Sequence, residues 1–410
     1  MHEQHASPEA IRRFLRSELP AGETSGLVRH LVARCPDCRS AAGRVAWAAA
    51  VPTPSSRALG RPDRIRRAAY DQAFAAVERQ VDTREQELAR QRALAAEQWR
   101  ELRLHPSLRR RWRIRNDPRF GTWGFCERLL EECQALGGRD PGQAGELAGL
   151  AVDAVARLEA ERYGAARVAD LQAFAWGTLG EAHRLQLDLT AAGAALARAR
   201  ALLGTGTGDF FEEARLVTFE MSLAKDEGEI ESAVGALGWA ARVYRRAGET
   251  HREGKALLLQ AGAAGELDPE RGLALLEQAL EKTDRSDRRL DLCARHHRIS
   301  FLDALGRSRY AAMLLDGARH LYRPFGDLRT RTALRWLEGR LARSLGDLAT
   351  AEAAFEEVLP VFAERGLRFQ LNRLSLDLAA VYMERGKMDK VLSLAFGTFE
   401  AEAVEAVAVH

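Results

Sequence analysis

Four residues near the amino terminus have the types and spacing of a metal site. His30 is followed by Cys35 and Cys38, and His5 lies upstream of all three. A Cys-x2-Cys pair directs two thiolates at one ion, and thiolate and imidazole are the usual ligands of tetrahedral zinc. We therefore predict a zinc ion bound by His30, Cys35 and Cys38, with His5 or else His2 as the fourth ligand. The alternative is that these are ordinary surface residues or the remnant of a lost site.

A closed set of four protein ligands indicates a structural ion, since catalytic zinc keeps one position open for water. Two predicted helices frame the site: residues 7–19, with Ser7 as the cap and Ile11 turned inward, and residues 27–42, which run into the cysteine pair. About 50 residues bury little apolar surface, so zinc would supply much of the folding free energy of this part.

This arrangement resembles the zinc-binding anti-sigma domain, whose pattern is a His or Cys, some two dozen residues, then His-x3-Cys-x2-Cys. The chain departs from the pattern at one point, because four residues instead of three separate His30 from Cys35. The resemblance covers residues 1–51. It implies a bacterial sigma factor as the partner, occlusion of its polymerase-binding surface as the mechanism, and release of zinc when Cys35 and Cys38 are oxidised.

From about residue 120 onward the sequence repeats itself. Residues 176–199 resemble a tetratricopeptide repeat, W-x2-L-G-x2-Y followed by A-x3-F-x2-A, with a histidine where the aromatic usually stands. The matching residues are Trp176, Leu179, Gly180, His183, Ala192, Leu196 and Ala199. Equivalents of the small residue that opens the second helix can be placed at Ala151, Ala192, Ala233, Gly272, Ala311, Ala351 and Val391.

The steps between these small residues are close to 40, which predicts longer helices or loops than the standard motif. Glycines five residues before several of them predict turns with positive φ: Gly228, Gly306, Gly346 and Gly386. Large apolar residues four positions after them should fill the space between hairpins: Leu196, Leu237, Leu276, Leu315 and Phe355. The fold class is therefore all-α, with a TPR-like α-solenoid of about seven hairpins and a concave face.

Four segments follow from this pattern. Residues 1–51 form the zinc-binding domain, and residues 52–62 form a linker rich in Pro, Ser and Gly. Residues 63–119 hold a long helix followed by a basic turn. The helix is expected at 64–104, with an apolar stripe that is interrupted at Arg84 and Gln91. Residues 120–410 form the solenoid.

Charge is uneven along the chain although the net charge is only +3. Residues 1–120 hold 24 arginines against 14 acidic residues, which leaves the rest acidic. Seven of these arginines lie close together: Arg103, Arg109, Arg110, Arg111, Arg113, Arg115 and Arg119. We expect them to pair with acidic residues of the repeats, and the alternative is a site for a nucleic-acid backbone.

The chain lacks the sequence motifs of phosphate-binding loops, serine hydrolases and zinc proteases, so we predict no enzymatic activity. Cys126 and Cys133 should fill the core, and the group Cys293, His296 and His297 lacks a second ligand pair at metal-site spacing. No signal sequence or spanning segment is recognisable, which predicts a cytoplasmic location.

The sequence thus predicts a regulatory adaptor that binds a protein partner. The zinc domain is expected to bind a sigma factor. A peptide or helix would bind the concave face of the solenoid, where aromatic residues such as Trp239, Tyr244, Trp336 and Tyr382 were expected. The alternative is a scaffold that assembles a signalling or defence complex, with zinc serving only as a structural cap. No membrane is expected as a partner.

Overall fold

The chain is helical throughout the part that its computed structural model describes, with no strand there. The described residues are 7–15, 20, 23, 27, 62–137, 139–284 and 286–395. They belong to two units, Met1–Arg84 and Glu85–His410. None of the described helices is both long and apolar enough to cross a membrane.

In the first unit, α1 (Pro8–Leu15) begins as the sequence predicts. The hydroxyl of Ser7 accepts a hydrogen bond from the backbone N–H of Ala10 at 3.1 Å, and the side chain of Ile11 is buried. The long helix α4 (Pro62–Leu102) begins in this unit and continues into the second, and it starts and ends two residues earlier than expected. The predicted zinc ligands, the linker and most of the predicted second helix lie outside the described residues.

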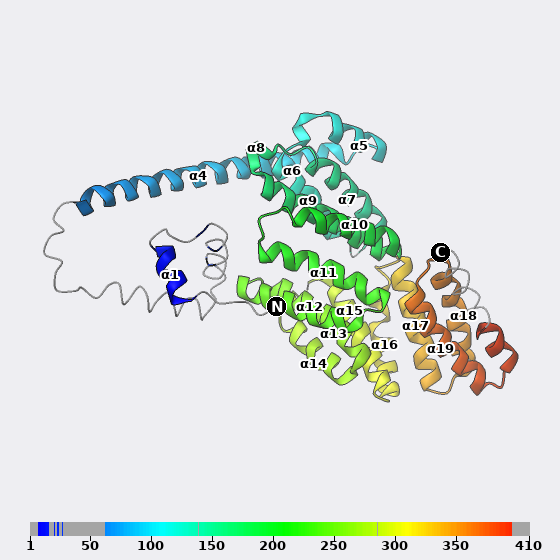
Figure 1. Ribbon diagram of the computed structural model, residues 1–410. Coiled ribbons are helices and arrows are strands. Elements are labelled where there is room, and N and C mark those ends of the chain that lie inside the picture. Colours follow the sequence, from blue (N-terminus) through cyan, green and yellow to red (C-terminus); the bar gives the residue numbers. More distant parts are fainter. Residues whose placement is uncertain are drawn as a thin grey trace, which may run out of the picture. The chain divides into compact units, whose positions relative to one another are not determined.

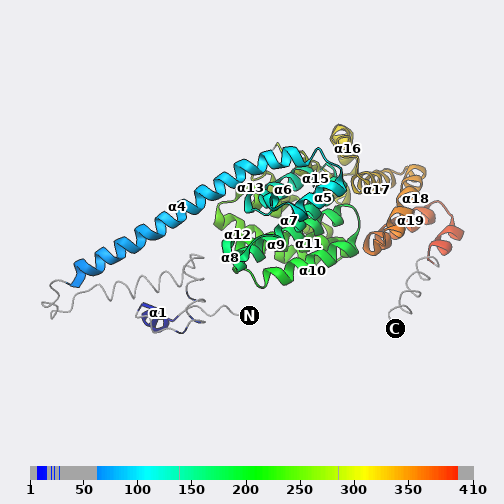
Figure 2. The same ribbon diagram turned by 90° about the horizontal axis from the view of Figure 1, so that it is seen from above.

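The second unit consists of consecutive helical hairpins, which Figures 1 and 2 show side by side. After α5 (Ser107–Asn116), the paired helices are α6 (Trp123–Gly137) and α7 (Pro141–Val155), α9 (Ala165–Leu185) and α10 (Leu189–Leu203), α11 (Phe210–Glu227) and α12 (Ile230–Ala247), α13 (Thr250–Leu267) and α14 (Pro269–Leu280), α15 (Arg288–Ala304) and α16 (Ser308–Tyr322), and α17 (Leu328–Ser344) and α18 (Leu348–Glu364). A seventh hairpin joins α19 (Arg368–Glu384) to helical residues 388–395. The short α8 (Ala160–Tyr163) lies between the first and second hairpins.

The first helices of successive hairpins contact one another and form one layer, from α6 and α9 through to α17 and α19. Each second helix instead packs against the first helix of the next hairpin, as α12 does against α13. Because every hairpin buries its apolar face on its neighbours, the stack shares a core that no single hairpin could build. The predicted TPR-like solenoid is the observed architecture.

The repeat phase predicted from the small residues is confirmed for six of seven hairpins. The small residue stands four positions after the residue that caps the second helix, as Ala192 does after Asp188 and Ala351 after Asp347. In α7 that position is Ala144, so the assignment to Ala151 is wrong by two helical turns. The error arises because α8 and its flanking loops lengthen the first repeat.

Close helix approach explains the small residues. A Cβ added to Gly272 would lie 2.6 Å from the Cα atom of Gly265, so α13 and α14 nearly touch backbone to backbone. The large residues placed four positions further on are all buried: Leu196, Leu237, Leu276, Leu315 and Phe355. Both findings agree with the sequence prediction.

The turns within hairpins use left-handed backbone conformations. Gly228, Gly306, Gly346 and Gly386 have φ values between 70° and 99°, as predicted. The second hairpin places Leu187 at the equivalent position with φ of 63°, the one non-glycine residue with positive φ among the described residues. Leu187 is buried in a cluster that also contains Leu367 and Leu378 from the last hairpins, and this packing compensates for its strained backbone.

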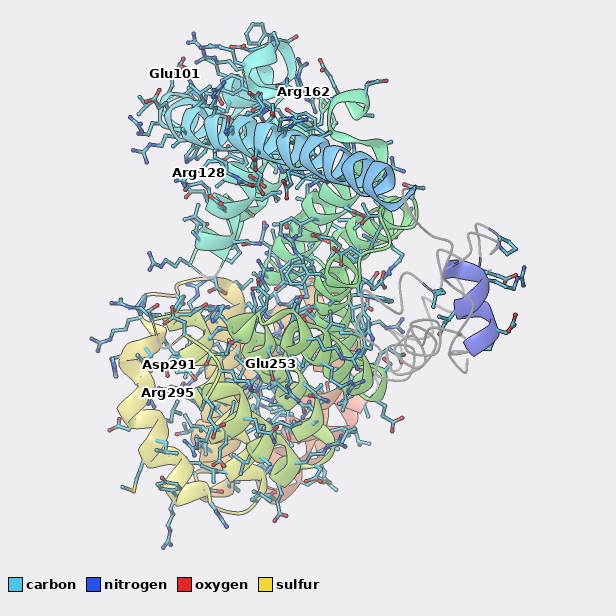
Figure 3. The ribbon with its side chains drawn as sticks, turned by 90° about the vertical axis from the view of Figure 1, so that its left-hand side faces the viewer. Glu101, Arg128, Arg162, Glu253, Asp291 and Arg295 are labelled. Carbon is cyan, nitrogen blue, oxygen red and sulfur yellow. The ribbon has the colours of Figure 1, made fainter. Side chains whose placement is uncertain are left out.

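The carboxyl-terminal half of α4 packs against the start of the solenoid. The buried Gln91, which interrupts the predicted apolar stripe, accepts hydrogen bonds from the backbone N–H of Gly124 at 3.3 Å and the hydroxyl of Tyr163 at 3.2 Å. Arg162 of α8 pairs with Glu87 of α4 at 2.8 Å, and Figure 3 shows Arg162 beside this helix. A polar residue on the stripe therefore fixes the helix to the first repeat.

Candidate partner-binding site

The inner side of the solenoid is the first-helix layer. Helix α19 of the seventh hairpin contacts α11 of the third hairpin. Both are first helices, and they can meet only if the solenoid is concave on the side of the first helices. Figures 1 and 2 both show α19 near the end of α11. Side chains of the first helices therefore line the concave surface on which a partner was predicted to bind.

Four residues hold this curvature, and we call them the closure cluster: Arg184, Asp226, Arg329 and Gln370. The carboxylate of Asp226 accepts from Arg184 at 2.7 Å and from Arg329 at 2.8 Å. The backbone carbonyl of Asp226 accepts from the Gln370 amide at 2.7 Å. Arg184 and Asp226 belong to the early hairpins, whereas Arg329 and Gln370 belong to α17 and α19, so the cluster joins distant parts of the chain.

Electrostatics in the closure cluster favour the charged form of its carboxylate. Burial alone would raise the pKa of Asp226, but the positive charges of Arg329 and Arg184 hold it well below its ordinary value. Arg184 is buried as well and has a second carboxylate partner in Glu181, at 2.7 Å. Removal of Asp226 would therefore leave Arg329 without its only ion-pair partner in the described structure and Arg184 with one partner fewer.

Two further contacts accompany this cluster. Arg373 of α19 pairs with Glu266 at the end of α13. Phe369 lies against Gly228, where an added Cβ would come within 2.7 Å of the aromatic ring. A glycine is required at residue 228 both by its φ of 99° and by this contact.

Lys225, His296 and His297 form a group on the first-helix layer that we call the inner histidine cluster. The Nδ1 atom of His296 lies 3.0 Å from the hydroxyl of Tyr322, and the ring of His297 stacks on Phe301 with centroids 5.7 Å apart. Both imidazoles are partly exposed. Lys225 comes from α11 and the histidines from α15, so two non-adjacent helices of the layer contribute to the cluster.

The two imidazoles of this cluster are neutral at pH 7. Desolvation by surrounding protein, followed by the positive charges of Lys225 and Arg340, lowers the pKa of His296 to about 4. The pKa of His297 is lowered well below its ordinary value by burial, Lys225 and His296. Lys225 has no ion pair within the described parts of the chain. The cluster thus offers a cation and polar ring nitrogens to a ligand that supplies a negative charge.

The aromatic residues expected on the concave face are mostly elsewhere. Trp239 and Tyr244 lie on α12, a second helix, and Tyr244 is buried in the core. Tyr382 is also buried, with its hydroxyl 2.8 Å from Glu356. Trp336 of α17 is on the first-helix layer but donates its ring N–H to Asp377 at 2.9 Å. The prediction that these aromatics form a partner site is therefore wrong for Tyr244 and Tyr382, because hairpin stacking buries them.

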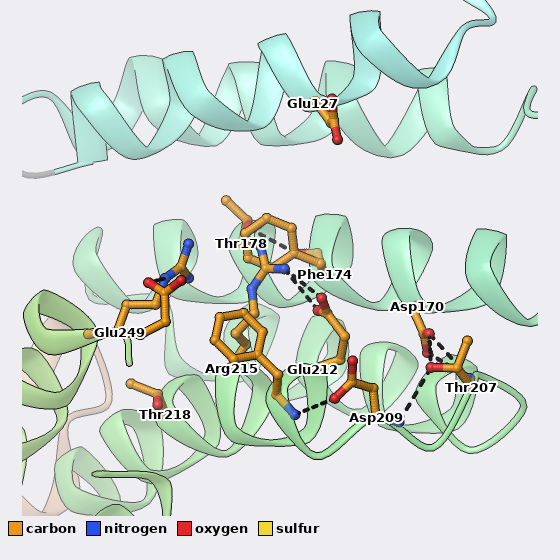
Figure 4. A network of polar contacts seen from close by, with 12 residues as sticks. Glu127, Asp170, Phe174, Thr178, Thr207, Asp209, Glu212, Arg215, Thr218 and Glu249 are labelled. Atoms are coloured by element: carbon orange, nitrogen blue, oxygen red, sulfur yellow. Dashed lines mark hydrogen bonds and ion pairs between the residues drawn. The ribbon is translucent and has the colours of Figure 1, made fainter. Parts of the chain in front are cut away.

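A separate pocket of about 200 Å³, including the open space at its mouth, lies between α9, α10 and α11. Figure 4 shows its polar lining, in which Arg215 stacks on the ring of Phe174 at 3.2 Å from the ring centroid and pairs with Glu212 at 2.9 Å. Burial raises the pKa of Glu212 and lowers that of Arg215. The volume is smaller than the several hundred Å³ typical of metabolite sites, so this network supports packing.

Next to this pocket, Asp170 holds the Gly-rich loop that precedes α11. Its carboxylate accepts from the backbone N–H of Thr207 at 3.2 Å and from the Thr207 hydroxyl at 2.6 Å (Figure 4). A Cβ on Gly206 would collide with Asp170 at 1.8 Å, so glycine is required there. The loop is a connection between α10 and α11.

The basic segment docks on the solenoid, as predicted. Arg110 pairs with Glu146 at 2.8 Å, and Arg111 and Arg115 both pair with Asp153 at 2.7 Å. Arg113 pairs with Glu101 of α4 and Arg119 with Asp117, each at 2.7 Å. Five of the seven arginines are therefore engaged by carboxylates of the chain itself.

The described cysteines behave as core residues or packing residues. Cys126 and Cys133 are buried, and burial raises the pKa of both thiols, that of Cys133 to about 12. Cys293 is partly exposed beside the inner histidine cluster. Within the described ranges, no group of three or more His, Cys, Asp or Glu could hold a metal ion. The four predicted ligands His5, His30, Cys35 and Cys38 lie outside those ranges.

Comparison with known proteins bears on the fold. No protein-family model and no curated protein sequence matches the chain. Among solved structures, it is similar to a Rap protein complexed with Competence and Sporulation Factor, with a TM-score of 0.54 and 16% sequence identity. The similarity covers 68% of this chain and 76% of that one. At this identity the likeness shows the fold alone, and the helical-repeat solenoid is confirmed.

Sequence reasoning identified His296 and His297 but assigned them no role, and it missed the closure cluster. The histidines were visible locally, because Cys293, His296 and His297 stand close together in the sequence. Asp226 and Arg329 carried none, because 103 residues separate them. Charged residues near a helix end are most often solvated.

Proposed function

We propose that this protein is a non-enzymatic regulatory adaptor whose solenoid binds an acidic segment of a protein partner on its inner side. The observation that carries the proposal is the inner histidine cluster, where the half-buried Lys225 makes no ion pair with the described residues. A partner carboxylate placed there would gain more from the cation than it would in bulk water. The bound factor in the Rap structure supports a partner-binding role for this fold.

For the amino-terminal part we propose a zinc-binding domain that occludes a sigma factor. The support is the spacing of His30, Cys35 and Cys38, with His5 upstream, and the resemblance of this pattern to the anti-sigma domain. The capped helix α1 with its buried Ile11 agrees with the helical frame of that domain. In this arrangement the solenoid receives the signal that releases the sigma factor.

The amino-terminal proposal is tested by purifying the full chain from its native cells and measuring its zinc content and its co-purifying proteins. The matched variant carries Cys35→Ser and Cys38→Ser. We expect about one zinc per chain and an enriched sigma factor with the native protein, and loss of both with the variant. If the same non-sigma partners accompany both proteins, the scaffold function, with zinc as a structural cap at most, replaces the sigma-factor proposal.

The solenoid proposal is tested by charge reversal on the two sides of the repeat stack. Lys225→Glu should weaken binding of the purified partner at least tenfold, because a repelling carboxylate replaces the attracting cation. Arg246→Glu is the control, since Arg246 is an exposed residue of the second helix α12. Equal binding by both variants, measured by titration calorimetry, would contradict inner-side binding.

A further inference from the structure

Helix α5 exposes large apolar side chains although two of its arginines, Arg110 and Arg113, are largely buried. Leu108 and Trp112 are 86% and 64% exposed, and Leu104, in the turn before the helix, is 79% exposed. Leu108 and Trp112 are four residues apart and therefore share one face. Exposed apolar side chains gathered in this way mark an interaction surface more often than they occur by chance.

Ion pairs fix this orientation. Arg110, Arg111 and Arg115 hold α5 against the acidic residues of α7, and Ile114 is the one apolar residue of α5 that is fully buried. Arg113 ties the helix to Glu101, which Figure 3 shows at the end of α4. Arg110, Arg113 and Ile114 lie on the face opposite Leu108 and Trp112, and the side chains of Arg110 and Arg113 are only 16% exposed, so the buried face of α5 is held by these residues and Leu108 and Trp112 point outward. Arg111 and Arg115 flank the two apolar side chains and are about half exposed.

Positive charge borders the apolar residues. The side chains of Arg103 and Arg109 are exposed and have no partner among the residues that the structure describes. Arginine and tryptophan are the residue types enriched at protein-binding hot spots, and exposed leucines add apolar area beside them. Complementarity therefore requires a partner that is apolar on one face and acidic at its edge.

Three other occupants fit this surface less well. The amino-terminal segment 1–51 is itself basic, with seven arginines against five acidic residues. A second copy of the chain would bring Arg103 and Arg109 against the same residues of its neighbour. An anionic membrane attracts each basic residue near its surface and is recognised by clusters of about four or more, whereas the ion pairs of Arg111, Arg113 and Arg115 with Asp153 and Glu101 leave few arginines of this segment unpaired.

We propose that Leu104, Leu108, Trp112, Arg103 and Arg109, the α5 surface, bind an acidic amphipathic helix of a protein partner. The apolar face of that helix covers Leu104, Leu108 and Trp112, and its carboxylates pair with Arg103 and Arg109. This interface is separate from the inner histidine cluster, so it can be occupied while the solenoid binds its own partner.

Site-specific photo-cross-linking of the full chain in its native cells tests the proposal. The photo-reactive residue p-benzoylphenylalanine is placed at Leu108 and, as a control, at Met313, which is 72% exposed on the second helix α16. We expect an adduct from residue 108 alone. Mass spectrometry should locate the cross-link in an acidic segment with apolar residues at helical spacing.

The purified partner is then titrated with matched variants. Leu108→Asp together with Trp112→Ala should weaken binding at least tenfold, and Met313→Asp should leave it unchanged. All three side chains are largely exposed, so the melting temperature of each variant should stay near that of the native protein, which separates lost binding from lost fold. Lys225→Glu should leave this binding unchanged, so that failure here is distinguishable from failure of the inner-side proposal.

Three results would overturn the proposal. They are an adduct between two copies of the chain, the same adducts from residues 108 and 313, or no adduct from residue 108. Binding of the native chain to phosphatidylglycerol vesicles that is lost in the Leu108→Asp, Trp112→Ala variant would assign the surface to a membrane instead.

Discussion

Replacement of Asp226 by asparagine should open the solenoid at the closure cluster. The substitution keeps the size of the side chain and removes the charge that Arg184 and Arg329 share. Loss of one partner from a buried ion pair typically costs about 3–5 kcal/mol because the remaining charge is left without compensation. Arg184 retains Glu181, and Arg329 is 25% exposed and can be hydrated, so we expect the lower end, about 3 kcal/mol.

A matched control is available at the surface. Asp291 pairs with Arg295 one helical turn away, and both side chains are solvated (Figure 3). Asp291→Asn removes the same charge from an exposed pair, which should cost about 0.3–0.5 kcal/mol. The contrast between the two substitutions isolates the effect of burial and of the long-range connection.

Hydrogen exchange is the suitable assay, because repeat proteins need not unfold in one step. Amides of α19 should exchange faster in Asp226→Asn, and small-angle scattering should show a larger radius of gyration, whereas Asp291→Asn should change neither. A double-mutant cycle with Arg329→Gln should give a coupling of at least about 1 kcal/mol. If Asp226→Asn costs no more than Asp291→Asn, the closure cluster does not hold the curvature and our reasoning is refuted.

Three further predictions concern single sites. The pKa of His296 is lowered to about 4, so the unfolded chain binds this proton more readily and stability is lost as the pH falls from 6.5 towards 4. After allowance for partial exposure the loss is about 1–3 kcal/mol, and His296→Gln should flatten this part of a urea-denaturation pH profile. Gly346→Ala should destabilise the protein by about 1 kcal/mol, because the φ of Gly346 is 87°. Gly317 lies inside α16 with open space around it, so Gly317→Ala should stabilise the protein by about 0.5–1 kcal/mol. Thermal melting of the two variants measures both effects. Buried Cys126 and Cys133 should resist iodoacetamide in the native protein and react after denaturation, and rapid native modification of either would contradict their burial.

The closure cluster and the α5 surface differ in how they are connected to the rest of the solenoid. The cluster connects repeats that are far apart in sequence, so occupancy of the inner side can be coupled to the curvature of the stack. The α5 surface is fixed by ion pairs to the first hairpin, where α4 also packs. A partner bound there would therefore meet a rigid element.

The repeat phase could be read from the sequence because the contacts it encodes are between neighbours. A small residue such as Ala192 and a large one such as Leu196 pack within one hairpin and on the next, so each repeat must carry its own copy of the pattern. The assignment failed at Ala151, where α8 lengthens the connection and breaks the fixed step on which the phase depended.

Contacts between repeats that are far apart in the sequence were decided by the tertiary structure alone. The sequence determined the all-α solenoid, its hairpin turns and the docking of the basic segment, but it did not place Asp226 beside Arg329 or turn Trp112 outward. Each hairpin adds a small rotation, and the sum of these rotations over four hairpins brings α19 to α11. No local pattern contains that sum, so residues whose roles depend on it, such as Asp226 and Arg329, could be brought together only in the folded chain.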